Sequence, residues 1–326
     1  MRIVFMGTPE FAVPALEKLV SGGYEIAAVY TQPDRAAGRG RVLEEPPVKK
    51  AALRLGLQVL QPENLKSPET KIQLVDLKPD AIVVAAFGQI LPPLVLSVPP
   101  FGCINIHPSL LPKYRGVAPV PAAILNGDEF TGVSIMLLDK GVDTGPVLSI
   151  VKVPILPEDT GGLLLEKLSH VGAQLLLDML PKWFKKEIQP QQQNNSLASY
   201  TKMITKEAGE IDWKLPAVDI WRRVRAYQPW PGCYTHWQGK QLKILEAVPL
   251  VGFAADTPGF VVAVKQGGAG FGVRCGDGVL GVIKVQIEGK KAITAEEFVR
   301  GRQKIIARCW GRNNYLELDS KGVILT

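Results

Sequence analysis

The stretch RIVFMGTPEFAVPALEKLVSGGYEIAAVYT, residues 2–31, decides the fold class. It starts with a short apolar run, continues with a helical pattern from Pro9 to Gly22-Gly23, and closes with a second apolar run. Strand, helix and strand in this order are typical of a parallel α/β sheet. Proline suits the first turn of a helix and glycine its end, and we expect Thr8 or Gly7 to cap it.

The same alternation continues to about residue 150. A helical pattern at 65–80 precedes the apolar run AIVVAA at 81–86, and further apolar runs follow at 102–106, 130–138 and 145–155. We predict an open, mostly parallel, Rossmann-like sheet with helices on both faces, in which the run at 145–155 pairs antiparallel with its neighbour. A long helix from about Gly161 to Lys186 closes this domain.

Residues 81–106 carry no charged side chain and are long enough to cross a bilayer. Prolines interrupt this segment, so we expect buried strands rather than a membrane helix. These prolines are Pro92, Pro93, Pro99 and Pro100.

The cysteines are scattered and form no C-x-x-C pair, which argues against a zinc cage or a disulfide framework. They are Cys103, Cys233, Cys275 and Cys309. The N-terminal MRIVFMG lacks the features of a signal peptide. We therefore expect a cytoplasmic protein with no membrane partner.

The net charge of +7 lies entirely in the C-terminal part of the chain. Residues 1–189 contain 19 basic and 19 acidic side chains, whereas residues 190–326 contain 19 and 12. We predict a catalytic domain at 1–189, a polar linker at 190–206 and a basic domain at 207–326. Such a charge suits a polyanion partner, although many basic domains only stay soluble.

Short Val- and Gly-rich runs from Cys233 onward predict a small OB-like β-barrel in this C-terminal domain. A helix at 216–227 precedes the runs, and TAEEFVRG, residues 294–301, begins with a Thr-x-x-Glu capping box.

The segment TQPDRAAGRGRVLEEPPVK, residues 31–49, is too long for an ordinary connection between strand and helix. It contains Arg35, Arg39 and Arg41 among small residues. We expect a loop without secondary structure, which is either a surface excursion or a functional element.

Several familiar sites are absent from the sequence. The first turn, MGTPEF, lacks the glycine run of a dinucleotide site, and neither a P-loop nor H-E-x-x-H occurs. The other histidines, His170 and His236, are distant in sequence from His107. We expect no metal.

The stretch CINIHPSLLPKYRG, residues 103–116, offers a different chemistry. Asn105 and His107 are two apart in a strand, so they point to the same side, and Pro108 ends the strand. Such a pair can merely hydrogen-bond loop backbone. A second polar turn, LLDKGVDTGPV at 137–147, favours catalysis, because Asp143 at the end of another strand can orient the imidazole.

These motifs resemble the folate-dependent formyltransferases along nearly the whole chain. The resemblance rests on VFMGTPEFA, PDRAAGRGR, FGQILP, NIHPSLLPKYRG, LDKGVDTGPVL, EAGEIDW and YQPWPG. The arginine-rich loop and the C-terminal domain are similar to the branch that formylates methionyl initiator tRNA.

The resemblance implies a formyl donor, a catalytic trio and two binding surfaces. The donor is 10-formyltetrahydrofolate, and the trio is Asn105, His107 and Asp143, in which the first two donate hydrogen bonds to the oxyanion. The implied folate-binding residues are Phe87, Gly88, Gln89, Ile90, Leu91, Ser109, Leu110, Leu111, Pro112, Asp139 and Gly141. The candidate tRNA contacts are Arg35, Arg39, Arg41, Arg222, Arg223, Arg225, Lys240, Lys243, Lys290 and Lys291.

Three alternatives stay open at this point. The same chemistry can act on a sugar or nucleotide amine, a hydrolase can pass the formyl group to water, and a non-enzymatic RNA-binding protein can explain the basic domain. The last alternative leaves the trio without a role. We expect the protein to act as a monomer.

Overall fold

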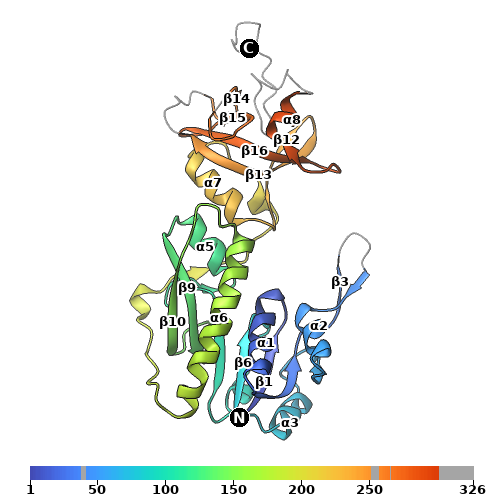
Figure 1. Cartoon of the computed structure of the whole chain (residues 1–326), viewed down its shortest axis with the longest axis vertical. Helices are drawn as coiled ribbons and strands as arrows, with labels where there is room; N and C mark the ends of the chain where they lie inside the picture. Colours follow the sequence, from blue (N-terminus) through green and yellow to red (C-terminus); the bar gives the residue numbers. More distant parts are fainter. Residues whose placement is uncertain (38–41, 251–256, 265, 301–326) are drawn as a thin grey trace. The chain divides into compact units, whose positions relative to one another are not determined.

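The computed structural model describes residues 1–37, 42–250, 257–264 and 266–300, and Figure 1 shows the course of the chain. Two compact units are present. Unit 1 comprises residues 1–120, 129–156 and 163–202, and unit 2 comprises residues 121–128, 157–162 and 203–326.

Unit 1 is built on a seven-stranded sheet, which in spatial order contains β10 (Val147–Pro154), β9 (Phe130–Leu137), β7 (Cys103–His107), β6 (Ala81–Ala85), β1 (Arg2–Gly7), β2 (Glu25–Tyr30) and β5 (Val59–Leu60). The five strands from β7 to β5 are parallel. At the other edge β9 is antiparallel to β7 and to β10. The predicted α/β fold and the predicted antiparallel pair are both confirmed.

Helices lie on both faces of this sheet, as the alternation predicted. The helices of the first 184 residues are α1 (Val13–Ser21), α2 (Pro47–Arg54), α3 (Pro68–Asp76), α4 (Pro93–Leu96), α5 (Pro119–Leu125) and α6 (Gly161–Phe184). On one face, Leu74 of α3 and Val95 of α4 share a buried cluster with Val4 and Met6 of β1. On the other face, Gly172 of α6 lies directly against Ile106 and Val133.

The first turn differs in detail from the prediction. The chain passes through a short 3-10 helix, η1 (Glu10–Ala12), before α1, and Pro9 occupies its N-cap position. Thr8 therefore caps no helix, and its hydroxyl donates instead to the carbonyl of Phe87 at 2.8 Å. The predicted end is confirmed, because Gly22 is the C-cap and Gly23 adopts a φ of 78°.

The long segment at 31–49 is not a structureless loop, so that expectation is wrong. It contains two short antiparallel strands, β3 (Arg35–Ala37) and β4 (Val42–Glu44), and the first turn of α2. Lys49 bridges the two arms of this hairpin, with its ammonium 2.6 Å from Asp34 and 3.0 Å from Glu45. Figure 1 shows β3 extending from the sheet.

Unit 2 contains an antiparallel sheet that, within the described ranges, forms half a barrel, in the order β12 (Cys233–Trp237), β13 (Lys240–Leu250), β16 (Val279–Ile287), β15 (Phe271–Arg274) and β14 (Val261–Val262). A short strand, β17 (Ile293–Thr294), also pairs with β16. The helices are α7 (Ala217–Ala226) and α8 (Ala295–Arg300). This confirms the predicted second β domain.

The capping box of α8 is confirmed in both directions. The Thr294 hydroxyl accepts from the Glu297 amide at 3.2 Å, and the Glu297 carboxylate accepts from the Thr294 amide at 3.0 Å. Phe298, one residue further, packs edge-on against Trp237 of β12. The cap therefore starts a helix that covers the sheet.

None of the helices within the described ranges combines the length and hydropathy that crossing a bilayer requires. Residues 81–106 fold into β6, α4 and β7.

Candidate active site

His107 is the last residue of β7, and Pro108 ends the strand as predicted. Asn105 and His107 lie on one face because side chains alternate along a strand, while Ile106 between them faces α6. Both polar side chains are enclosed, with Asn105 9% and His107 4% exposed.

Asp143 reaches His107 by a route that the sequence did not indicate. Because β9 is antiparallel to β7, its last residue Leu137 pairs with Ile104, and His107 pairs with Ser134. The end of β9 is thus distant from the end of β7. The loop 138–146 closes this distance and places the Asp143 carboxylate 3.6 Å from His107 Nδ1. The Gly116 amide donates to the same carboxylate oxygen at 2.8 Å.

The contacts of His107 define its resting state. Its Nε2 is 3.0 Å from the carbonyl oxygen of Tyr114, which can only accept, so Nε2 carries the hydrogen. Burial lowers the pKa of His107, and the negative charge of Asp143 opposes this more weakly. The ring is therefore neutral at rest, with the Nδ1 lone pair facing Asp143.

Asn105 contributes a free amide. Its side chain makes no hydrogen bond with any residue in the described part of the chain, although it is buried beside the next strand. Thr31 Oγ1 is the one side-chain atom in the described residues that is fully buried without a partner, so the unpaired amide of Asn105 keeps access to solvent or to a ligand although the residue is only 9% exposed. Its N–H groups are thus available to a developing oxyanion.

The predicted folate-binding loops lie at one edge of the sheet, because residues 87–91 follow β6 and residues 109–112 follow its parallel neighbour β7. Several of their side chains serve the fold. Ser109 is fully buried and donates to the Lys113 carbonyl at 2.7 Å, and Phe87 is 2% exposed. Ile90 is 83% exposed. A ligand at this edge therefore meets loop backbone and the outward side chains.

The predicted residues Asp139 and Gly141 stabilise the loop that carries Asp143. The Asp139 carboxylate accepts from the Gly141 amide at 2.9 Å and from the Thr144 hydroxyl at 2.6 Å. In this structure Asp139 therefore shapes the 138–146 loop.

The candidate tRNA contacts fall into separate groups. Arg35 is exposed on β3 and donates to Gln32 at 3.2 Å. Arg39 and Arg41 lie outside the described residues. Arg222 pairs with Asp219 at 3.3 Å, and Arg225 stacks on Trp221 at 4.5 Å.

The predicted lysines of unit 2 gather near one end of two paired strands. Because Leu242 of β13 pairs with Ile287 of β16, Lys240 lies at the same end of this pair as Lys290 and Lys291, and all three are exposed. Lys243, which follows Leu242 on β13, is half-buried, and so is Arg223 on α7. Three exposed lysines of the predicted set therefore lie at this end of the sheet.

Sequence reasoning missed four residues that build the site. Tyr114 and Ser134 hold the His107 region: the Ser134 hydroxyl donates to the Ser109 carbonyl at 2.7 Å and accepts from the Leu111 amide at 3.1 Å. The other two are Arg115, which is 1% exposed, and Gln193, which contacts the Asp143 loop. No periodic pattern marks them, since all four act through specific hydrogen bonds to loops and turns.

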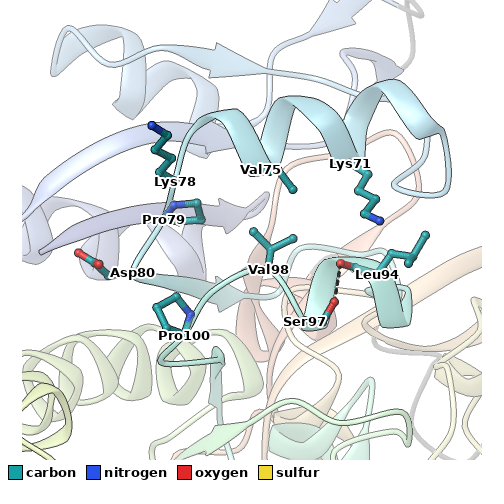
Figure 2. A pocket seen from close by; sticks show the side chains of 9 residues that line it. All are labelled: Lys71, Val75, Lys78, Pro79, Asp80, Leu94, Ser97, Val98 and Pro100. Atoms are coloured by element: carbon teal, nitrogen blue, oxygen red, sulfur yellow. Dashed lines mark hydrogen bonds between the residues drawn. The ribbon is translucent and has the colours of Figure 1, made fainter.

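A cavity of about 440 Å³ contains none of these residues in its lining, and Figure 2 shows the side chains that line it. It opens between α3 and α4 at the amino ends of β6 and β7, whereas His107 is at the carboxyl end. It is lined by Lys71, Val75, Lys78, Pro79, Asp80, Leu94, Ser97, Val98 and Pro100. None of the predicted site residues reaches it.

Other reaction centres receive no support. Burial raises the pKa of the Cys103 and Cys233 thiols to about 12, so neither is a nucleophile at neutral pH. Among the described side chains, no three His, Cys, Asp or Glu residues converge as a metal site requires.

A buried acid–base cluster on a mostly parallel sheet, followed by a separate antiparallel sheet, is the arrangement of a two-domain α/β group-transfer enzyme. Two family models specify the group: Formyl transferase matches residues 1–180, and Formyl transferase, C-terminal domain, matches residues 203–303. The chain belongs to the formyl transferase family.

Relatives called methionyl-tRNA formyltransferase match almost the whole chain. One from Dehalococcoides mccartyi (strain ATCC BAA-2266 / KCTC 15142 / 195) is 50% identical over 303 residues, covering 93% of this chain and 96% of the relative. One from Chloroflexus aurantiacus (strain ATCC 29366 / DSM 635 / J-10-fl) is 48% identical over 301 residues, covering 92% of this chain and 97% of the relative.

Solved structures match the fold. The sugar 3N-formyltransferase WlaRD, crystallised in the presence of dTDP and 5-N-formyl-THF, has a TM-score of 0.63 at 20% identity, covering 89% of this chain and 99% of its own. Methionyl-tRNA formyltransferase from Clostridium thermocellum has a TM-score of 0.54 at 17% identity, and the match covers 76% of this chain and 93% of that chain. At these identities the likeness concerns the fold alone.

Proposed function

We propose that this chain transfers the formyl group of 10-formyltetrahydrofolate to the free amino group of methionyl initiator tRNA, which gives N-formylmethionyl-tRNA. The observation that carries the proposal is the unpaired and accessible amide of Asn105, a residue that is only 9% exposed, on the same strand as the buried His107 that Asp143 faces. Membership of the formyl transferase family supports the reaction, and the names of the relatives support the acceptor.

The reaction needs charge stabilisation and one proton transfer. The amine nitrogen attacks the formyl carbon, the carbon–N10 bond breaks, and a proton moves from the amine to N10 of the folate. Negative charge develops on the formyl oxygen during the attack. The Asn105 amide donates to that oxygen, a role in which losing one donor costs on the order of 10²–10³ in rate.

His107 receives the proton in this proposal. Nε2 donates to the Tyr114 carbonyl, whereas the unprotonated Nδ1 lies 3.6 Å from Asp143 and can accept a proton. In this proposal Asn105 therefore holds the oxyanion, and His107 acts as the proton acceptor. A neutral Nδ1 accepts the proton, Asp143 stabilises the imidazolium that forms, and the pair returns the proton to N10.

The folate substrate occupies the edge formed by residues 87–91, 109–112 and 139–141. Loop backbone and half-buried Leu110 and Pro112 provide the contact surface there. The acceptor amine enters from the side of Asp143, whose side chain is 14% exposed.

The basic C-terminal part binds the tRNA backbone. Its excess of basic side chains and the lysines at one end of the β13–β16 pair support this role. We propose the division into a catalytic domain at 1–189, a linker at 190–206 and a tRNA-binding domain at 207–326. A monomer acting in the cytoplasm fits a substrate that is a charged tRNA.

One experiment tests the proposal. The full chain is incubated with 10-formyltetrahydrofolate and, in parallel, with methionyl initiator tRNA, free methionine, an amino sugar nucleotide or no acceptor. We expect N-formylated product only with the charged tRNA. Product with the sugar nucleotide, or formate without any acceptor, overturns the assignment of the acceptor.

A further inference from the structure

Residues 191–201, which follow α6, run beside the turn that carries Tyr114 and Arg115, and we call them the strap. The Arg115 amide donates to the Ser199 carbonyl at 2.9 Å, and the Tyr114 amide donates to the Ser199 hydroxyl at 2.8 Å. Two short strands, β8 (Arg115–Gly116) and β11 (Tyr200–Thr201), pair in parallel. The strap therefore borders the site over much of its length.

Arg115 is a buried cation whose partners on the strap are uncharged. Its Nε and Nη2 both donate to the side-chain oxygen of Gln193, at 3.0 and 2.8 Å. Nη2 also donates to Asn195 at 2.8 Å, and Nη1 donates to the Tyr200 hydroxyl at 3.0 Å. Because guanidinium can only donate, it fixes which end of the Gln193 amide faces it.

The other end of that amide holds the Asp143 loop. With its oxygen turned to Arg115, Gln193 donates through Nε2 to the carbonyls of Asp143 at 2.9 Å and Gly145 at 2.7 Å. All four hydrogen-bonding positions of the amide are used. Asp143 has a φ of 52°, a left-handed conformation that L residues adopt rarely and that surrounding contacts must maintain.

We propose that Gln193, oriented by Arg115, is a positioning residue that holds the 143–145 turn so that the Asp143 carboxylate faces His107. The kinetic part of this inference rests on the proposed function, whereas its structural part does not. If the strap served only to close unit 1, the contact between Gln193 and Arg115 would suffice. The two hydrogen bonds that Gln193 donates to the 143–145 turn would then have no role.

The variant Gln193→Glu separates these two roles. A glutamate keeps the size of the side chain and gives Arg115 a charged partner, but it cannot donate to the two loop carbonyls. We expect the ion pair with Arg115 to keep the strap docked and the protein folded, while kcat falls about 10²-fold and the KM for folate stays unchanged. In an enzyme that already carries Asp143→Asn, adding Gln193→Glu lowers kcat by less than about a further twofold. A Gln193→Glu enzyme with wild-type kcat overturns the proposal.

A second measurement needs no substrate. The charge of Asp143 raises the pKa of His107. If Gln193→Met displaces that carboxylate, the pH midpoint of the His107 titration falls toward the midpoint found in Asp143→Asn. The ring signals of the three histidines are titrated by NMR and assigned with His107→Asn. The exposed neighbour Gln192 provides the matched control, Gln192→Met, which leaves the midpoint unchanged. An unshifted midpoint in Gln193→Met overturns the proposal even if no formyl transfer is found in wild type.

Discussion

Asp143→Asn removes one negative charge 3.6 Å from His107 Nδ1 and changes little else. The asparagine oxygen still accepts the Gly116 amide, which lies 2.8 Å from the carboxylate in the wild type. Asparagine also tolerates the left-handed φ of 52° at this position. The variant therefore tests the charge of Asp143 rather than the fold of its loop.

The magnitude follows from the distance between the two groups. Two unit charges 3.6 Å apart interact with about 4.6 kcal/mol at an effective dielectric constant of about 20. Little solvent screens them, because the two side chains are 5% and 14% exposed. If the imidazolium forms in the transition state, losing this interaction lowers kcat by about 10³-fold.

The assay measures formylation of methionyl initiator tRNA under single-turnover conditions, alongside urea unfolding of both proteins. Asp178→Asn, on the exposed side of α6, removes a charge far from the site and serves as the control. We expect its kcat to equal that of wild type. A folded Asp143→Asn enzyme that keeps more than a tenth of wild-type kcat refutes the role of the pair as proton acceptor.

Three further outcomes are expected. Ser134→Ala leaves the Ser109 carbonyl and the Leu111 amide unpaired. Urea unfolding should therefore show an unfolding free energy lower by roughly 2–4 kcal/mol, and the KM for folate should rise. An unchanged KM would show that the 109–112 loop does not contribute to folate binding. Burial holds the pKa of His107 below its usual 6.5, so the folded state resists protonation of this ring and loses stability as the pH falls below 6.5. Between pH 7 and 5 the unfolding free energy of His107→Asn should therefore fall less than that of wild type, and the two slopes should differ by at most about 1.4 kcal/mol per pH unit. Parallel curves of unfolding free energy against pH would contradict this. Arg39→Ala or Arg41→Ala should weaken use of the charged tRNA and reduce its salt dependence by about one ion per arginine, with folate affinity unchanged; an equal loss of both would indicate misfolding.

The sequence alone determined the parallel sheet, because its strand and helix patterns are local. The end of α1 at Gly22-Gly23 and the capping box of α8 were also predictable, since each depends on residues within one turn. Asn105 and His107 were identifiable for the same reason, as alternation along one strand puts them on the same face.

Only the tertiary structure decided how the site is assembled. The contact between His107 and Asp143 depends on a loop that returns from an antiparallel strand, and the sequence suggested instead that two strand ends meet. The protonation state of His107 follows from the Tyr114 carbonyl and from burial, and neither is visible in a motif. Gln193 reaches Asp143 across 50 residues of chain. Periodicity describes neighbours along the chain, whereas hydrogen bonds between distant turns exist only once the sheet has brought those turns together.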